Sequence, residues 1–83
     1  MKVTNPLGMH ARPSAMLVQT ASKFKSDIWI SKENHEVNAK SMLGVMTLAA
    51  EMGSTLVIRA NGSDEDRALD ALARIFEMRF GEN

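Results

Sequence analysis

The chain has 83 residues, of which 45% are hydrophobic, and its ten basic side chains are balanced by ten acidic ones. This size and apolar content predict one small folded domain spanning residues 1–83 and exclude a disordered chain. A formal net charge of zero disfavours a protein that binds nucleic acid through bulk positive charge.

The first part of the chain predicts a short strand followed by an amphipathic helix. Residues 1–5 favour a strand that ends at Pro6, which lacks the N–H that a central ladder needs. Gly8 then allows the chain to turn. From residue 11 to about 24 the apolar side chains recur at helical spacing, and three of them are expected in the core: Leu17, Ala21 and Phe24. Pro13 fits in the first turn, where a missing N–H costs little.

The middle of the chain predicts a hairpin followed by a short helix. The segment "SDIWIS" at 26–31 is rich in strand-forming residues, "KENHE" is a plausible polar connection, and "VNA" at 37–39 returns as a strand. Ser41 is a candidate N-cap, and four apolar residues follow it in two helical turns: Met42, Leu43, Val45 and Met46. Gly44 weakens this helix, so we expect it to be short.

The last part predicts one strand and the clearest helix of the chain. In "STLVIRANG" at 54–62, one face carries Leu56, Ile58 and Ala60, and the other carries Val57 and Arg59. Ser63 or Asp64 is expected to cap the following helix, whose first turn is acidic as the helix dipole favours. Its predicted buried stripe is Leu69, Leu72 and Phe76, and Gly81 is its expected stop.

These elements follow one another in the order β-α-β-β-α-β-α. The predicted fold class is therefore α/β (α+β): a four-stranded antiparallel sheet with three helices on one face. The other face of the sheet is expected to stay open to solvent, and by alternation it should carry Trp29 and Val57.

Several site types are not expected. No apolar run reaches the ~20 residues that a membrane-spanning helix needs, and the N-terminus has no apolar signal-peptide core, so we expect a cytoplasmic protein. The chain has no cysteine, and His10 and His35 do not have the spacing of a shared metal site. We therefore expect no metal and no cofactor, and we assign His35 no role.

His10 stands where a helix start would favour a bound anion. The first N–H groups of a helix lack intrahelical partners, and the helix dipole adds partial positive charge. Because Pro13 has no N–H, the amides of Ala11 and Arg12 lie nearest to the cap, and Arg12 adds a guanidinium suited to phosphate. Histidine is partly neutral and nucleophilic at cell pH. Position alone leaves two alternatives open, a phosphoryl-accepting histidine and an ordinary surface or capping residue.

Two longer segments resemble a known family. "GMHARPSAMLVQTASKF" is similar to the active-site signature of HPr, the histidine-containing phosphocarrier of the bacterial phosphoenolpyruvate-dependent phosphotransferase system. "NAKSMLGVMTLAA" resembles the second signature of that family, around a regulatory serine, at the family's spacing. The similarity runs from about Lys2 to Leu72.

The resemblance implies an open-faced β-sandwich with three helices and a carrier rather than an enzyme. It implies that His10 accepts a phosphoryl group on Nδ1 from Enzyme I and donates it to a histidine of an EIIA domain. Arg12 matches the family's active-site arginine, and Ala11, Arg12 and Pro13 match the helix start that supports the phosphate.

The resemblance also implies regulation and docking. Ser41 matches the serine that an HPr kinase/phosphorylase modifies in many bacteria, with a transcriptional regulator as a further partner; the alternative is that Ser41 is only an N-cap. The docking patch would comprise Met42, Leu43 and Met46, since Met-rich apolar surface adapts to several partners, although a two-turn helix must also bury one face. We expect Met42 and Met46 to be exposed.

Three functions remain in competition at this stage. The first is a phosphocarrier in sugar uptake, expected to be monomeric and to bind neither nucleic acid nor membrane. The second is a nitrogen-related carrier or a regulatory HPr relative that acts by docking: "RIFEMRFGEN" resembles the nitrogen-related branch, whereas "KSMLGVM" resembles the sugar branch. The third is a small anion-binding or RNA-binding domain, which zero net charge and few aromatics disfavour.

Overall fold

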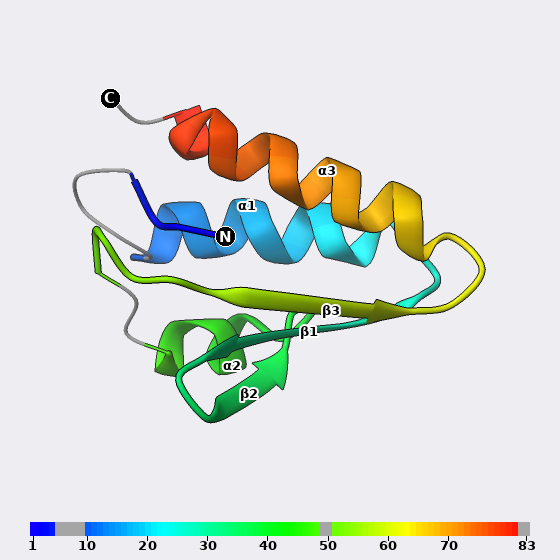
Figure 1. The fold of residues 1–83 in the computed structure, drawn as a ribbon, viewed down its shortest axis with the longest axis horizontal. Coiled ribbons are helices and arrows are strands. Elements are labelled where there is room, and N and C mark those ends of the chain that lie inside the picture. The colour runs from blue at the N-terminus through cyan, green and yellow to red at the C-terminus, as the bar shows by residue number, and fades with distance from the viewer. Residues whose placement is uncertain (5–9, 49–50, 82–83) are drawn as a thin grey trace.

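The computed structural model describes residues 1–4, 10–48 and 51–81 (Figure 1). The predicted turn at Pro6 and Gly8 lies outside these residues. In chain order the elements are α1 (Ala11–Ser22), β1 (Asp27–Lys32), β2 (His35–Asn38), α2 (Met42–Thr47), β3 (Val57–Asn61), α3 (Glu65–Glu77) and a 3₁₀ turn, η1 (Arg79–Gly81). None of the described helices is long and apolar enough to cross a membrane.

The sheet is antiparallel, with the order β2-β1-β3, and β1 at its centre. Our prediction of four strands is wrong in the count, because residues 1–4 form only an isolated bridge, Lys2 to Thr55. The Val3 N–H donates to the Ser54 carbonyl at 2.8 Å, and the Val3 carbonyl accepts from the Gly53 N–H at 2.7 Å. The first segment therefore lies where the predicted strand would, but this contact is too short to form a ladder.

The core lies between the sheet and the helices, as alternation along the strands predicts. Ile28 and Ile30 of β1 are buried on the inner face, and they share one apolar cluster with buried residues from all three helices. Figure 1 shows α1 and α3 side by side over the sheet, and α2 packs against α1 and β2. The predicted core residues Leu17 and Ala21 are fully buried, and Phe24 packs against the cluster.

The outer face of the sheet is open, as predicted. Val57 is 63% exposed, and the Trp29 ring lies beneath the guanidinium of Arg59, whose Cζ is 3.9 Å from the ring centroid. The same guanidinium donates a hydrogen bond of 2.9 Å to Glu36. These polar and aromatic side chains cover part of the sheet without closing it.

Helix α3 begins where the sequence predicts, and it ends earlier than predicted. Leu72 and Phe76 are buried as expected, whereas Leu69 is only partly buried. The helix stops at Glu77 rather than near Gly81, because the chain turns left-handed at Arg79 and Phe80, with φ values of 53° and 54°. This turn folds the Phe80 ring against Phe76, with centroids 4.9 Å apart.

The N-cap of α3 has an unexpected partner. Asp64 occupies the cap position, but its carboxylate makes no bond to the helix. It accepts hydrogen bonds from the backbone N–H of Lys25 at 2.9 Å, from the N–H of Ser26 at 3.0 Å and from the Ser26 hydroxyl. We call Lys25, Ser26, Gly62 and Asp64 the Ser26–Asp64 cluster. The Ser26 hydroxyl, followed by the Lys25 N–H, lowers the pKa of Asp64 to about 2.

Candidate functional site

His10 is the N-cap of α1. Its backbone is extended, with φ −78° and ψ −171°, and its carbonyl accepts the first helical hydrogen bond from the Ser14 N–H at 3.0 Å. The imidazole makes no capping hydrogen bond to the helix, so it does not serve as a side-chain cap. The ring is half-buried at the end of the helix that carries the unpaired amides.

The first turn of α1 presents its polar groups outward. Ala11 and Arg12 are exposed, whereas Pro13 is buried and turns its ring toward the protein. The helix thus begins with two amides and one guanidinium on its solvent side. The three residues predicted to support a phosphate occupy successive positions directly after His10.

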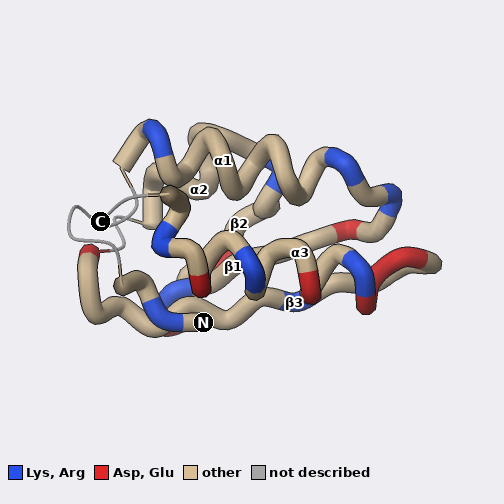
Figure 2. Tube along the Cα trace, turned by 90° about the horizontal axis from the view of Figure 1, so that it is seen from above, with Lys and Arg blue, Asp and Glu red and all other residues tan. Residues whose placement is uncertain are grey.

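The electrostatics around α1 favour an anion. Residues 1–26 contain no Asp or Glu, and Arg12 is the sole charged residue of α1. Figure 2 shows this contrast between α1, which carries no red segment, and α3, which carries red and blue segments along its length. In a chain of zero net charge, the charged side chains of the first 26 residues are therefore all basic.

Ser41 is the N-cap of α2, as predicted. Its backbone is extended, with φ −104° and ψ 114°, and its Oγ accepts a hydrogen bond from the Gly44 N–H at 3.1 Å. Its own N–H donates to the Asn38 carbonyl at 3.0 Å. Ser41 is partly exposed as a residue, and its hydroxyl is bonded to the start of the helix.

The apolar residues of α2 differ in their exposure to solvent, which the sequence of so short a helix could predict only in part. Leu43 is 78% exposed and Met46 is 43% exposed, whereas Val45 is buried in the core. Met42 is only partly exposed, so our expectation for it is met only in part. Figures 1 and 2 place α2 and the start of α1 toward the same end of the molecule, and the two helices contact each other.

One contact that orients α2 has no signal in the sequence. The Lys40 ammonium donates to the Phe24 carbonyl at 2.7 Å, just beyond the end of α1. The Lys40 N–H donates to the Asn38 side chain at 2.8 Å. These bonds fix the segment that leads into Ser41, and sequence patterns cannot reveal them because the lysine and its carbonyl partner meet only in the fold.

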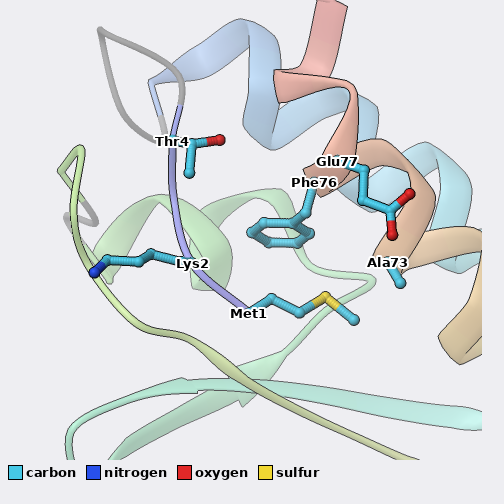
Figure 3. A pocket seen from close by; sticks show the side chains of 6 residues that line it. All are labelled: Met1, Lys2, Thr4, Ala73, Phe76 and Glu77. Carbon is cyan, nitrogen blue, oxygen red and sulfur yellow. The ribbon is translucent and has the colours of Figure 1, made fainter.

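The described residues contain no cluster of three or more His, Cys, Asp or Glu side chains that could hold a metal ion. An open, mostly apolar cavity has a volume of about 250 Å³. Figure 3 shows the residues that line it: Met1, Lys2, Thr4, Ala73, Phe76 and Glu77. It lies between the first segment and α3, and none of the predicted site residues lines it. The candidate site around His10 and α2 therefore lies apart from this cavity.

Comparison with known proteins identifies the class. A family model described as "PTS HPr component phosphorylation site" matches residues 1–78. The chain is 52% identical over 83 residues to the phosphocarrier protein HPr of Xylella fastidiosa, covering 100% of this chain and 93% of that protein. It is also 46% identical over 70 residues to the HPr-like protein Crh of Halalkalibacterium halodurans, covering 84% of this chain and 83% of that protein.

Solved structures agree with this result. The crystal structure of HPr-C-His from Thermoanaerobacter tengcongensis has a TM-score of 0.96 at 47% identity, with 100% of this chain and 93% of that chain covered. The chain is thus a phosphocarrier and not an enzyme. It belongs to the HPr family of the phosphotransferase system, which confirms the resemblance and the predicted fold class.

Proposed function

We propose that this protein relays a phosphoryl group from phosphorylated Enzyme I to a histidine on an EIIA domain through Nδ1 of His10. The observation that carries the proposal is the position of His10 at the N-cap of α1, within the residues that match the phosphorylation-site model. In the first step an N–P bond forms on His10 as the N–P bond on Enzyme I breaks. In the second step the bond on His10 breaks as one forms on EIIA.

The start of α1 would stabilise the phosphorylated ring. The amides of Ala11 and Arg12 are free of intrahelical acceptors by their position, and the helix dipole adds to their attraction for an anion. The Arg12 guanidinium supplies further donors, while Pro13 fixes the backbone of the turn. Because no carboxylate lies in residues 1–26, no acidic side chain of that segment would repel the phosphate.

The exposed side of α2 is the proposed docking surface for both partners. Leu43 and Met46 offer apolar area beside the start of α1, and Met42 contributes its exposed part. One surface that serves donor and acceptor in turn must release each partner, and flexible methionine side chains suit such repeated contacts.

Ser41 is the proposed regulatory site, modified by an HPr kinase/phosphorylase with ATP. It is partly exposed as a residue, at the start of the docking helix. A phosphate there would add a charge of about −2 beside the docking patch and repel an acidic partner, while a transcriptional regulator could read the new group. This regulation is proposed for a sugar-uptake system in the cytoplasm.

The relay is tested by incubation with Enzyme I and phosphoenolpyruvate. We expect an acid-labile phosphate on the protein that is absent in His10→Ala. His35→Ala is the matched control, since it removes the other histidine, on the exposed start of β2, and should label normally. If the unaltered protein takes up no label from several Enzyme I sources, the relay is refuted and a relative acting by docking alone becomes the better account.

Ser41 is tested separately with HPr kinase and ATP. We expect an acid-stable phosphate that is missing in Ser41→Ala, whereas His10→Ala should be modified normally. Absence of modification in the unaltered protein would reduce Ser41 to a helix cap.

We further propose that the relaying form is a monomer. The backbone groups of residues 1–3 bond to residues 53–56 of the same chain, so a monomer can satisfy them without a partner. A Bacillus subtilis Crh structure, with a TM-score of 0.80 and 39% identity over 95% of this chain and 91% of that chain, is described as a dimer with a swapping domain. Light scattering across a range of concentrations tests this, and a dimer at working concentration would contradict it.

A further inference from the structure

Gly44 lies in unusually close contact with two neighbours. A Cβ atom added there would lie 3.3 Å from the Ser41 Oγ, 3.3 Å from the Ser41 Cβ and 3.3 Å from the Val37 Cβ. Carbon atoms in favourable contact are about 3.5–4.0 Å apart. Any side chain at this position would therefore press against both the hydroxyl of Ser41 and the strand beneath it.

The neighbours of Gly44 are fixed by their own bonds. Val37 is paired with Ile30 in the sheet. The Ser41 N–H is bonded to the Asn38 carbonyl at 3.0 Å, and the Ser41 carbonyl accepts from the Val45 N–H at 2.9 Å. These bonds resist a shift of either residue, so an added methyl group would occupy space beside the Ser41 hydroxyl.

We propose that Gly44 is a specificity-determining residue for phosphorylation of Ser41, because it leaves open the space that the hydroxyl needs to react and that the phosphoryl group then fills. The inference rests on the proposed regulatory role of Ser41. In the reaction an Oγ–P bond forms to the γ-phosphorus of ATP, the bond from that phosphorus to the ADP oxygen breaks, and a base of the kinase takes the hydroxyl proton. A methyl group at Gly44 would crowd both the attack and the product.

The choice of residue supports a requirement for space. Glycine is the poorest helix former apart from proline, and α2 has only six residues, so it carries the glycine at a cost to its own stability. Alanine would favour the helix and disfavour the modification. The rival explanation is that Gly44 only permits close packing on Val37. Under our proposal a methyl group at Gly44 lowers the reactivity of residue 41, whereas under the rival explanation it does not.

A chemical probe measures that reactivity without a kinase. The chain has no cysteine, so Ser41→Cys introduces a single thiol at the site. Iodoacetamide alkylates it as a C–S bond forms and iodide leaves. We expect the alkylation rate to fall about fivefold or more when Gly44→Ala is added, since thiol reactivity depends on access.

Thr47→Ala is the matched control. It also places an alanine in α2, at an exposed position. It removes the hydrogen bond from the Thr47 hydroxyl to the Gly44 carbonyl, 2.6 Å long, but adds no atom near residue 41, so it controls for a disturbance of Gly44 that does not fill space. Added to Ser41→Cys, it should leave the alkylation rate unchanged. Equal rates with and without Gly44→Ala would overturn the proposal.

Two enzymatic measurements separate the inference from the functions on which it rests. With HPr kinase and ATP, Gly44→Ala should lose phosphorylation at Ser41, while uptake of label at His10 from Enzyme I remains normal. If the kinase modifies neither protein, the regulatory role fails, and the alkylation rates still decide whether Gly44 provides the space. If Gly44→Ala loses the His10 label as well, the added methyl group disturbs α2 as a whole and not only the space beside Ser41, and the proposal is overturned.

Discussion

The two ends of the molecule differ in which side chains they leave exposed to solvent and which they bond to one another. At one end, the start of α1 and the exposed side of α2 present Arg12, Leu43 and Met46 to solvent. At the other end, the turns that follow α1 and β3 meet (Figure 1), and the Ser26–Asp64 cluster bonds its donors and acceptors to one another. Ser26 is 2% exposed and Asp64 is 9% exposed.

This difference separates the residues that stabilise the fold from the residues whose chemistry is available to a partner. Buried polar groups that are fully bonded fix the geometry of their surroundings, and loss of one partner leaves the other unsatisfied. Exposed groups contribute little to stability, so their chemistry is available to a partner. Substitutions in the Ser26–Asp64 cluster should therefore change unfolding, whereas substitutions near His10 should change transfer.

The largest loss of stability is expected for Gly62→Ala. The new Cβ would lie 2.5 Å from the Ser26 Oγ and 2.6 Å from the Ser26 Cα, so the backbone of one turn must shift and the bonds to Asp64 must distort. We expect the free energy of unfolding to fall by about 3 kcal/mol, measured by urea denaturation.

Gly53→Ala is the control for this experiment. Gly53 has φ +93°, but a Cβ there meets nothing within 4 Å, so the cost is conformational alone, about 1 kcal/mol. If both variants lost the same free energy of unfolding, the cost of Gly62→Ala would come from backbone strain alone, with no contribution from the close contact with Ser26.

A smaller loss is expected for Asp64→Asn, and it should depend on pH. The Lys25 N–H and the Ser26 donors bond to different oxygens of Asp64. An amide would face one of these partners with its oxygen and the other with its NH₂ group, so at least one bond is lost or replaced by a repulsive contact. The pKa of the native carboxyl is about 2, against an ordinary value of 3.8. A lowered native pKa stabilises the fold above the ordinary value, and this contribution is lost as the pH falls from about 4 to about 2.

Thermal unfolding at pH 7 and in steps from pH 4 to pH 2 measures this effect. The Tm of Asp64→Asn should lie below that of the unaltered protein at pH 7. The difference between the two Tm values should decrease as the pH falls from 4 to 2. Asp70→Asn, which alters an exposed residue of α3, should follow the unaltered protein. A gap that stays constant down to pH 2 would contradict the role of the Asp64 charge.

At the other end, Arg12→Ala should reduce transfer with little change in stability. Removal of the guanidinium that we propose to contact the transferring phosphoryl group should slow uptake from Enzyme I about tenfold or more, or ~1.4 kcal/mol in the transition state. Because Arg12 is exposed, the free energy of unfolding should change by less than about 0.5 kcal/mol.

Arg67→Ala provides the comparison, since it removes an exposed arginine from the first turns of α3. It should leave the uptake rate unchanged. Equal slowing in the two variants would mean that general charge attraction, and not the position of Arg12, controls transfer.

The sequence predicted the parts that depend on local patterns. Alternation assigned Leu56 and Val57 to opposite faces, and helical spacing placed Leu17 and Leu72 in the core. The Ser41 cap was predicted for the same reason, because its bond spans only three residues. The position of His10 before a helix was equally local, whereas its role and that of Ser41 came from the resemblance and stay predictions.

Features that depend on distant contacts were not predictable. Asp64 was expected to cap its own helix, but its donors at Ser26 lie 38 positions earlier, and they meet it only after the sheet has formed. The exposure of Leu43 could not be assigned because two helical turns do not define a face. The space beside Ser41 depends on Val37, whose approach to α2 is set by the packing of the hairpin.

The smallest effect is expected on the open face of the sheet, where contacts are neither buried nor part of the proposed site. The ion pair of Arg59 and Glu36 has side chains 56% and 43% exposed, so Glu36→Gln should cost less than about 0.5 kcal/mol. Arg59→Ala also removes the contact with Trp29 and should cost about 1 kcal/mol. Urea denaturation followed by the fluorescence of the single tryptophan measures both. If Glu36→Gln lowered the free energy of unfolding as much as Gly62→Ala, exposed ion pairs would stabilise the fold as strongly as the Ser26–Asp64 cluster. That result would contradict the difference proposed between the exposed and the buried regions.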